Sequence, residues 1–171
     1  TEGLVGSEMC IRDRYMRYPL FIFAFLCLVG CQDDILSSSP TFQGLRHGDY
    51  FWRSTARTAT VQTTGIFNIS GSDGYGTMII SLPAATVGNY ELGQGKPATV
   101  TYTELNTTYS TQNNGDQYPV YLSDGQVTLE SIDVENKTMR GSFYFNSYDD
   151  SGTKYMNFSQ GVFYNLSYNE Q

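Results

Sequence analysis

Few residues in this chain combine into a recognisable catalytic or metal site. The sequence has one histidine, His47, and three cysteines among 171 residues. Nucleophilic catalysis needs a base and an orienting partner, and metal sites need several ligands at short spacing. His47 lies in Arg46-His47-Gly48-Asp49, where its pKa range would suit a proton shuttle. We favour a hairpin turn there, and we predict no catalytic residues, no metal and no cofactor.

Carboxylates offer two further kinds of chemistry. A glycosidase needs two carboxyl groups about 5 to 9.5 Å apart, and Glu91, Glu104 and Glu130 are the candidates for such a pair. Calcium binding favours an Asp-x-Asp-x-Asp-Gly loop, which neither Asp33-Asp34 nor Asp149-Asp150 matches. We predict a linker at the first acidic pair and a turn at the second. The protein is therefore expected not to be an enzyme.

Tyrosine is the residue type that best supports binding. The chain has 14 tyrosines, whose rings can stack on sugars while their hydroxyls form hydrogen bonds. The competing explanation is that tyrosine suits the half-exposed face of a strand. We predict a long loop or an irregular hairpin at Asn106–Tyr118, and loops often carry function. Tyr109 and Tyr118, which lie there, are therefore the predicted contact surface.

The overall charge argues against nucleic acid as a partner. The chain has 10 basic and 17 acidic residues, and its net charge is −7. Proteins that bind nucleic acid neutralise phosphates with clustered lysine and arginine, and no such cluster occurs here. The remaining partner classes are a membrane, reached through a lipid anchor, and a glycan or protein ligand.

The N-terminal region has the organisation of a bacterial lipoprotein signal. Arg17 is followed by an apolar run, Pro19–Gly30, that is too short to span a bilayer. The run ends in Leu28-Val29-Gly30-Cys31, where the small Gly30 allows a signal peptidase to approach. We predict cleavage between Gly30 and Cys31 and lipidation of Cys31. No cysteine follows Cys31, so the folded domain has no thiol chemistry.

These signals divide the chain into four predicted segments. Residues 4–14 resemble the translation of a sequencing-library adapter, so 1–15 is interpreted as an adapter-derived artefact. Residues 16–30 form the signal peptide, 31–40 an acidic and serine-rich linker, and 41–171 a single β domain. Gln32-Asp33-Asp34 resembles the export signal of Bacteroidota surface lipoproteins. We expect a lipid-anchored outer-membrane protein exposed on the cell surface, with a periplasm-facing anchor as the alternative.

The domain itself reads as short antiparallel strands. A period of two predicts that Met139, Phe143 and Phe145 face the core while Arg140, Tyr144 and Asn146 do not. Flanking strands at Gly125–Asp133, with Val127 and Leu129 inward, and at Lys154–Leu166 complete a C-terminal three-stranded meander. The turns are Glu135-Asn136-Lys137 and Asp149-Asp150-Ser151-Gly152. Earlier strands are predicted at Thr41–Leu45, Tyr50–Ser54, Arg57–Gln62, Ile66–Ser70, Thr77–Leu82, Tyr90–Leu92 and Ala98–Leu105.

This pattern predicts an all-β fold, either an antiparallel β-sandwich or a partly open β-barrel of about 8–10 short strands. Trp52 follows a turn and is expected in the core. The glycine-rich Ser70–Gly76 lacks the lysine of a phosphate-binding loop and is predicted to connect two strands.

Several segments resemble a known family. They are Phe67-Asn68-Ile69 followed by Gly71-Ser72-Asp73, the segment Gly88–Gly93, Val127–Leu129, Arg140–Phe143 and Gly161–Leu166. They look like the small Bacteroidota lipoproteins grouped as domain of unknown function 6252, over roughly Phe42–Tyr168. The resemblance implies a secreted, lipid-anchored β domain and supplies no catalytic residues.

Two functions follow as hypotheses. The first is a non-catalytic binding domain displayed on the outer membrane. The alternative is a barrel-like carrier that holds a small apolar ligand inside, as closed eight-stranded barrels can. An empty apolar interior would favour the carrier, whereas a filled core with exposed aromatic side chains would favour recognition at the surface.

Overall fold

The computed structural model describes residues 39–116 and 119–171, which form twelve strands. Within this part of the chain no helix is long and apolar enough to cross a membrane. The strands are β1 (Thr41–Arg46), β2 (Tyr50–Arg53), β3 (Ala56–Val61), β4 (Phe67–Ser72), β5 (Gly76–Leu82), β6 (Gly88–Leu92), β7 (Thr99–Glu104), β8 (Thr107–Ser110), β9 (Asp124–Asp133), β10 (Thr138–Asp149), β11 (Tyr155–Ser167) and β12 (Asn169–Glu170).

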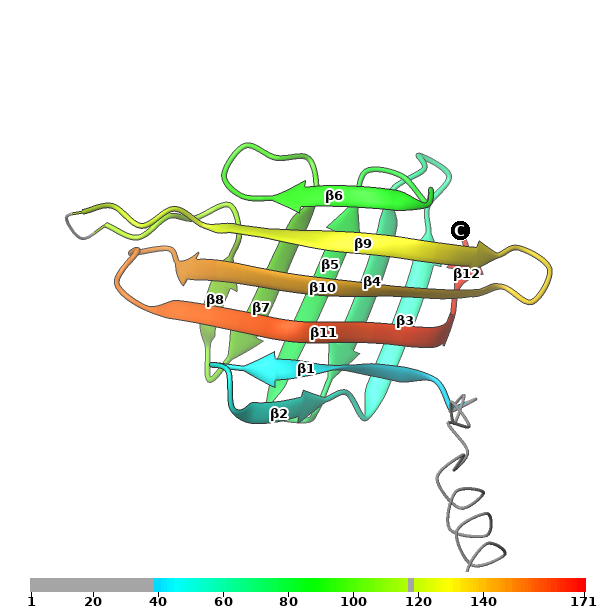
Figure 1. The fold of residues 1–171 in the computed structure, drawn as a ribbon, viewed down its shortest axis with the longest axis horizontal. Coiled ribbons are helices and arrows are strands. Elements are labelled where there is room, and N and C mark those ends of the chain that lie inside the picture. Colours follow the sequence, from blue (N-terminus) through cyan, green and yellow to red (C-terminus); the bar gives the residue numbers. More distant parts are fainter. Residues whose placement is uncertain (1–38, 117–118) are drawn as a thin grey trace, which may run out of the picture. The chain divides into compact units, whose positions relative to one another are not determined.

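The strands form two layers that cross steeply (Figure 1). One layer has the order β6-β9-β10-β11-β1-β2, and the other has the order β12-β3-β4-β5-β7-β8. The layers join where β8 pairs with the end of β10, at Tyr148↔Ser110 and Asp149↔Tyr109. Every pairing is antiparallel except that between β12 and β3. The all-β prediction is confirmed, and the sheet does not close into a barrel.

The predicted meander is present as β9, β10 and β11, in the predicted order. Along β10 the buried and exposed residues alternate, so Met139, Phe143 and Phe145 face the core while Arg140, Tyr144 and Asn146 face solvent. Val127 and Leu129 of β9 are also buried. The period of two therefore predicted the correct face for each of these side chains.

Aromatic rings fill the space between the two layers. Trp52 is buried, as predicted, and its ring packs edge-on against Phe42 at 5.3 Å, Phe158 at 5.7 Å and Tyr102 at 6.5 Å between centroids. Phe145 stacks on Phe158 at 5.2 Å. Edge-to-face and offset-stacked rings are favourable arrangements. The interior enclosed by the described strands is thus occupied by the protein's own side chains.

The stretch Asn106–Tyr118 is only partly the long loop or irregular hairpin that the sequence predicted. Its first residues form β8, which pairs with both β7 and β10. Leu105 and Asn106 have φ angles of 47° and 66°, as the two central residues of a type I′ hairpin turn require. The strand-favouring Thr107, Thr108 and Tyr109 follow this turn. Pairing on two sides then holds them as a strand.

Candidate binding site

Three turns line a pocket of about 240 Å³ at one end of the domain. They connect β1 to β2, β4 to β5 and β7 to β8. The first and the last lie side by side at the lower edge of Figure 1, and the second is next to them because Gly76 pairs with Glu104. We call this site the Arg46 pocket. Its lining residues are Arg46, Tyr50, Asp73, Tyr75, Glu104 and Leu105.

Arg46 is held in a fixed position by contacts from both layers. It is the last residue of β1, and it forms an ion pair with Glu104 at the end of β7. Its Nη1 also donates a hydrogen bond to the Tyr102 hydroxyl at 3.3 Å. The guanidinium lies 4.5 Å from the centroid of the Tyr50 ring, which is a cation–π distance. The side chains of Arg46 and Glu104 are 19% and 22% exposed.

The Tyr102 phenol at the base of this ion pair stays protonated over a wide pH range. Burial raises the pKa of Tyr102 to about 12, although the hydrogen bond from Arg46 acts in the opposite direction. The neutral hydroxyl can therefore accept the Arg46 hydrogen bond at neutral and mildly alkaline pH.

This pKa predicts a loss of stability at alkaline pH. An unfolded tyrosine ionises near pH 10, whereas folded Tyr102 ionises only near pH 12. Between these values the unfolded state binds fewer protons, so the free energy of unfolding falls as pH rises. The contribution of Tyr102 to this loss is on the order of 1 kcal/mol at pH 11. We expect urea melts at pH 8 and pH 11 to show it.

Tyr102→Phe should remove this part of the pH dependence, while Tyr144→Phe, at an exposed position on β10, should retain the wild-type slope. If Tyr102→Phe keeps the full alkaline loss, the assignment to Tyr102 is wrong.

The turn between β4 and β5 presents Tyr75 to solvent. The Asp73 Oδ1 accepts hydrogen bonds from the backbone N–H groups of Tyr75 and Gly76, at 2.9 and 2.7 Å. Gly74, between Asp73 and Tyr75, has a φ of 92°, which glycine adopts without strain. Tyr75 is 84% exposed and Leu105, across the pocket, is 88% exposed. The pocket thus has a polar base and an apolar rim.

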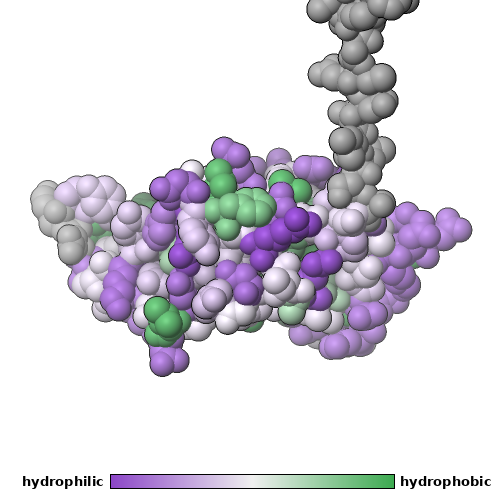
Figure 2. Space-filling view, turned by 90° about the horizontal axis from the view of Figure 1, so that it is seen from below, coloured by the Kyte–Doolittle hydropathy of each residue, from purple (hydrophilic) through white to green (hydrophobic). Residues whose placement is uncertain are grey.

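Figure 2 looks onto this end of the domain from the lower edge of Figure 1. Hydrophobic side chains appear as separate green patches among white and purple ones. A mixed surface of this kind differs from the continuous apolar patches that mark hydrophobic interfaces. This side of the domain thus shows no continuous apolar patch of that kind.

Of the two predicted contact residues, Tyr109 is described, and it is not among the residues that line the pocket. Tyr109 is on β8 opposite Tyr102, and its side chain packs partly buried against the core. Burial, together with the charges of Glu104 and Asp149, raises the pKa of Tyr109. Tyr118, Gly30 and Cys31 lie outside the described residues. Tyr109 is thus a neighbour of the pocket base and is less available to a ligand than the exposed Tyr75.

The rest of the predicted loop, as far as it is described (residues 111–116), is held by its own amide side chains. The Gln112 Nε2 donates to the carbonyls of Gly93 and Lys96, at 3.2 and 3.1 Å. The Asn113 Nδ2 donates to the Tyr148 carbonyl at 3.2 Å, and the Asn114 Oδ1 accepts from the Ser123 N–H at 2.9 Å. These polar residues therefore have a structural explanation.

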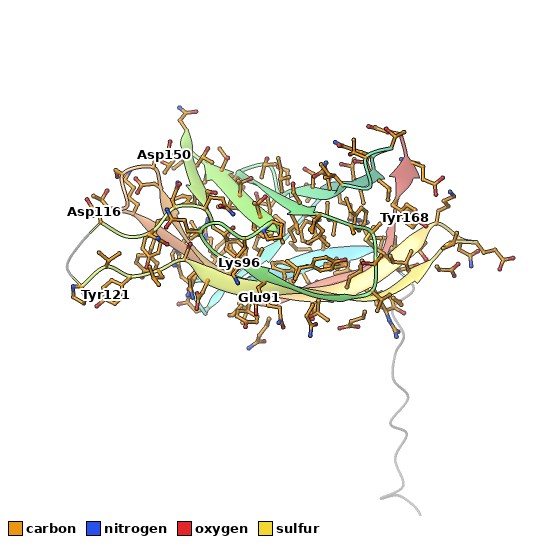
Figure 3. All side chains as sticks on the ribbon, turned by 90° about the horizontal axis from the view of Figure 1, so that it is seen from above. Glu91, Lys96, Asp116, Tyr121, Asp150 and Tyr168 are labelled. Carbon is orange, nitrogen blue, oxygen red and sulfur yellow. The ribbon has the colours of Figure 1, made fainter. Side chains whose placement is uncertain are left out.

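Figure 3 shows where this region lies. Asp116, Tyr121 and Asp150 are together at one end of the domain, and Tyr168 is at the other. Asp150 accepts a hydrogen bond from Asn113 at 3.0 Å, and the Asp116 N–H donates to the Gly152 carbonyl at 3.2 Å. The turn predicted at residues 149–152 is therefore present and is bonded to the loop before β9.

The residues considered for catalysis each contact a different partner. His47 is in a turn, as favoured from the sequence, and its ring contacts Tyr155 at 5.3 Å between centroids. Each candidate glutamate faces a different cation. Glu91 pairs with Lys96 at 2.6 Å, and both residues are labelled in Figure 3. The other two pairs are Glu104–Arg46 and Glu130–Arg140. Among the residues with described positions, no three His, Cys, Asp or Glu side chains are grouped to hold a metal ion.

Sequence reasoning missed the Arg46 pocket, although some of its turns carry recognisable signals. Asp73-Gly74 is a turn dipeptide, and Asn106 is a residue that tolerates positive φ. These signals locate turns along the chain. Which turns meet in space depends on the strand order, which the sequence alone did not provide.

Comparison with known proteins gives a family. Residues 38–167 match the family model described as Domain of unknown function (DUF6252). No curated protein and no solved structure matches the chain.

Proposed function

The chain belongs to the family described as Domain of unknown function (DUF6252), and from its candidate site we propose that it is a non-catalytic binding domain of the cell envelope. The ligand is bound at the Arg46 pocket, and a lipid on Cys31 anchors the chain in the outer membrane. In this proposal the domain is displayed on the cell surface, as the acidic residues after Cys31 suggest.

One observation carries the binding role: a fixed guanidinium–carboxylate pair lies within a rim of exposed side chains. Because Arg46 is held by Glu104, Tyr102 and Tyr50 before any ligand arrives, its ordering adds little cost to binding. The exposed ring of Tyr75 supplies contact area with few rotatable bonds. Such pre-ordered polar groups beside aromatic side chains are common in recognition sites.

The filled interior supports recognition at the surface over internal carriage. A carrier needs an empty apolar volume between its layers, and here Trp52, Phe158 and their neighbours occupy the space between the described strands. The pairing of each candidate glutamate with a cation of the protein likewise supports a role without catalysis.

The anchor is tested by Cys31→Ser in the full chain expressed from Met16 in a bacterial host. We expect the variant to remain unprocessed or to leave the membrane pellet, because two or more acyl chains give stable membrane attachment. Cell fractionation and mass spectrometry of the N-terminus measure both outcomes. Unchanged processing with full membrane retention would contradict lipidation at Cys31.

The binding role is tested by a glycan array and by co-purification, both with the full chain in detergent. Tyr75→Ala is the informative variant because Tyr75 is exposed on a turn, and Tyr144→Ala is the matched control on the outer face of β10. We expect a ligand that is lost with the first variant and kept with the second. Reproducible turnover of a glycan, ester or peptide, abolished by changing Glu91, Glu104, Glu130 or His47, would overturn the proposal.

A further inference from the structure

We infer that the Arg46 pocket takes one uncharged sugar unit of a larger glycan. This inference rests on the proposed binding role of that pocket and adds the chemical class of the ligand. Three properties support it: the size of the pocket, the ion pair between Arg46 and Glu104 inside it, and the exposed side chains at its rim.

The size of the pocket favours a part of a polymer. Its volume is about 240 Å³, which is below the roughly 300 to 1,000 Å³ of pockets that enclose a whole small molecule. Such a volume accommodates a single ring or side chain. In a longer glycan, one unit would occupy the pocket and the adjoining units would lie along the rim formed by Tyr75 and Leu105.

Two of the three charged side chains that line the pocket compensate each other. Glu104 pairs with Arg46, and the Asp73 Oδ1 accepts two backbone hydrogen bonds within its own turn. An acidic sugar would meet two carboxylates and an arginine whose charge is already balanced by Glu104. The chain as a whole also carries a net charge of −7. An anionic ligand is therefore disfavoured.

A basic peptide is the competing ligand class. A lysine or arginine side chain binds best to an unpaired carboxylate or to a free aromatic face. In this pocket the Tyr50 ring already holds Arg46 at 4.5 Å, and Glu104 is already in an ion pair. A ligand cation would have to displace Arg46 from these two contacts or bind to Asp73 and Tyr75 instead.

Sugar hydroxyls suit this arrangement because each can both donate and accept a hydrogen bond. The guanidinium of Arg46 offers donors, and the carboxylates of Glu104 and Asp73 offer acceptors in the same pocket. The C–H faces of a sugar ring can pack on the Tyr75 ring, whose hydroxyl supplies a further polar contact. An uncharged sugar thus matches both the polar base and the apolar rim.

The test measures binding of the full chain in detergent to soluble mannan, xylan, a mixed glucan, polygalacturonate and an oligolysine peptide. We expect at least one neutral polysaccharide to bind, with an affinity that changes less than about twofold between low and high salt, because no net charge is neutralised. Tyr75→Ala should weaken this binding at least about fivefold, as aromatic contact residues do. Tyr144→Ala should leave it unchanged.

A second variant tests charge compensation directly. Glu104→Gln removes the carboxylate that neutralises Arg46, so we expect this variant to gain salt-sensitive binding to polygalacturonate that the wild-type chain lacks. Circular dichroism melts confirm that the variant is folded before binding is measured. Wild-type binding to polygalacturonate, or no gain in the folded variant, would overturn the inference about charge.

The outcomes separate the ligand class from the proposed function. If oligolysine or another peptide binds in a Tyr75-dependent way and no neutral polysaccharide does, the sugar class is wrong but the pocket remains a binding site. If every ligand found for the chain binds Tyr75→Ala as well as wild type, both the sugar class and the proposed site are wrong.

Discussion

Phe143→Ala is expected to lower the free energy of unfolding by about 3–5 kcal/mol. Phe143 is 3% exposed, and its ring packs against Phe42 at 5.6 Å and against Phe145 at 6.3 Å between centroids. The two layers are joined by strand pairing at β8, so they cannot fully collapse into the space that the ring leaves. Urea melts of the purified protein measure the loss as a lower transition midpoint.

The neighbouring residue provides the matched control. Tyr144 is 51% exposed and lies on the opposite face of β10, so Tyr144→Ala should cost less than about 1 kcal/mol, as surface substitutions do. Equal losses from the two variants would mean that β10 is displaced by one residue, because such a shift exchanges the two faces of a strand.

The alternation around Phe143 and Tyr144 explains why so much of the fold could be predicted. Side chains along a strand point to opposite faces in turn. The alternation of apolar and polar residues from Met139 to Asn146 therefore indicates which side chains are buried. The turns before and after β10 could also be predicted, because they contain residues that favour turns. In the structure the Asn136 side chain donates to Asp133 at 2.7 Å, and Gly152 has a φ of 70°. Local signals were sufficient for these elements.

The strands that the sequence did not predict depend on distant partners. β12 has two residues, and it exists because Asn169 and Glu170 pair with Thr60 and Val61 of β3. β8 has four residues that stand within a polar stretch, and it is stabilised by pairing with β7 and β10. Such short strands carry too little local pattern to be distinguished from a loop.

The candidate site has the same dependence on distant contacts. Arg46 and Glu104 are 58 residues apart in the chain, and nothing near either residue indicates that they meet. The long polar stretch attracted the functional prediction because loops often carry function. In the structure its amides bond to neighbouring segments, as the contacts of Gln112 with Gly93 and Lys96 illustrate.

Gly161→Ala is the second substitution expected to have a large effect on stability. Gly161 of β11 is opposite Phe143 of β10, and an added Cβ would lie 2.5 Å from the Phe143 ring atoms Cε2 and Cζ. Such overpacking of a core typically costs about 1–3 kcal/mol. Gly161 is not among the residues with positive φ, so the loss would come from packing and not from backbone strain.

The origin of this loss can be isolated with a double-mutant cycle. All three of the nearest atoms to a Cβ at Gly161 belong to the Phe143 ring, so Phe143→Ala should remove the clash. In that background Gly161→Ala should cost at least about 1 kcal/mol less than it does alone, because contacting residues couple by this order. Additive losses in urea melts would contradict the packing of Phe143 over Gly161.

The pair Gly141 and Phe163, two register positions along β10 and β11, gives a control with a different expected outcome. A Cβ at Gly141 would lie 2.4 Å from the Phe163 Cζ but also 2.2 Å from the backbone carbonyl oxygen of Thr128. Phe163→Ala can relieve only the first of these contacts, since the second belongs to the neighbouring strand β9. We therefore expect Gly141→Ala to remain destabilising in the Phe163→Ala background, in contrast to Gly161→Ala in the Phe143→Ala background. This difference would show that a side chain excludes a larger residue at Gly161, whereas the backbone of the sheet also excludes it at Gly141.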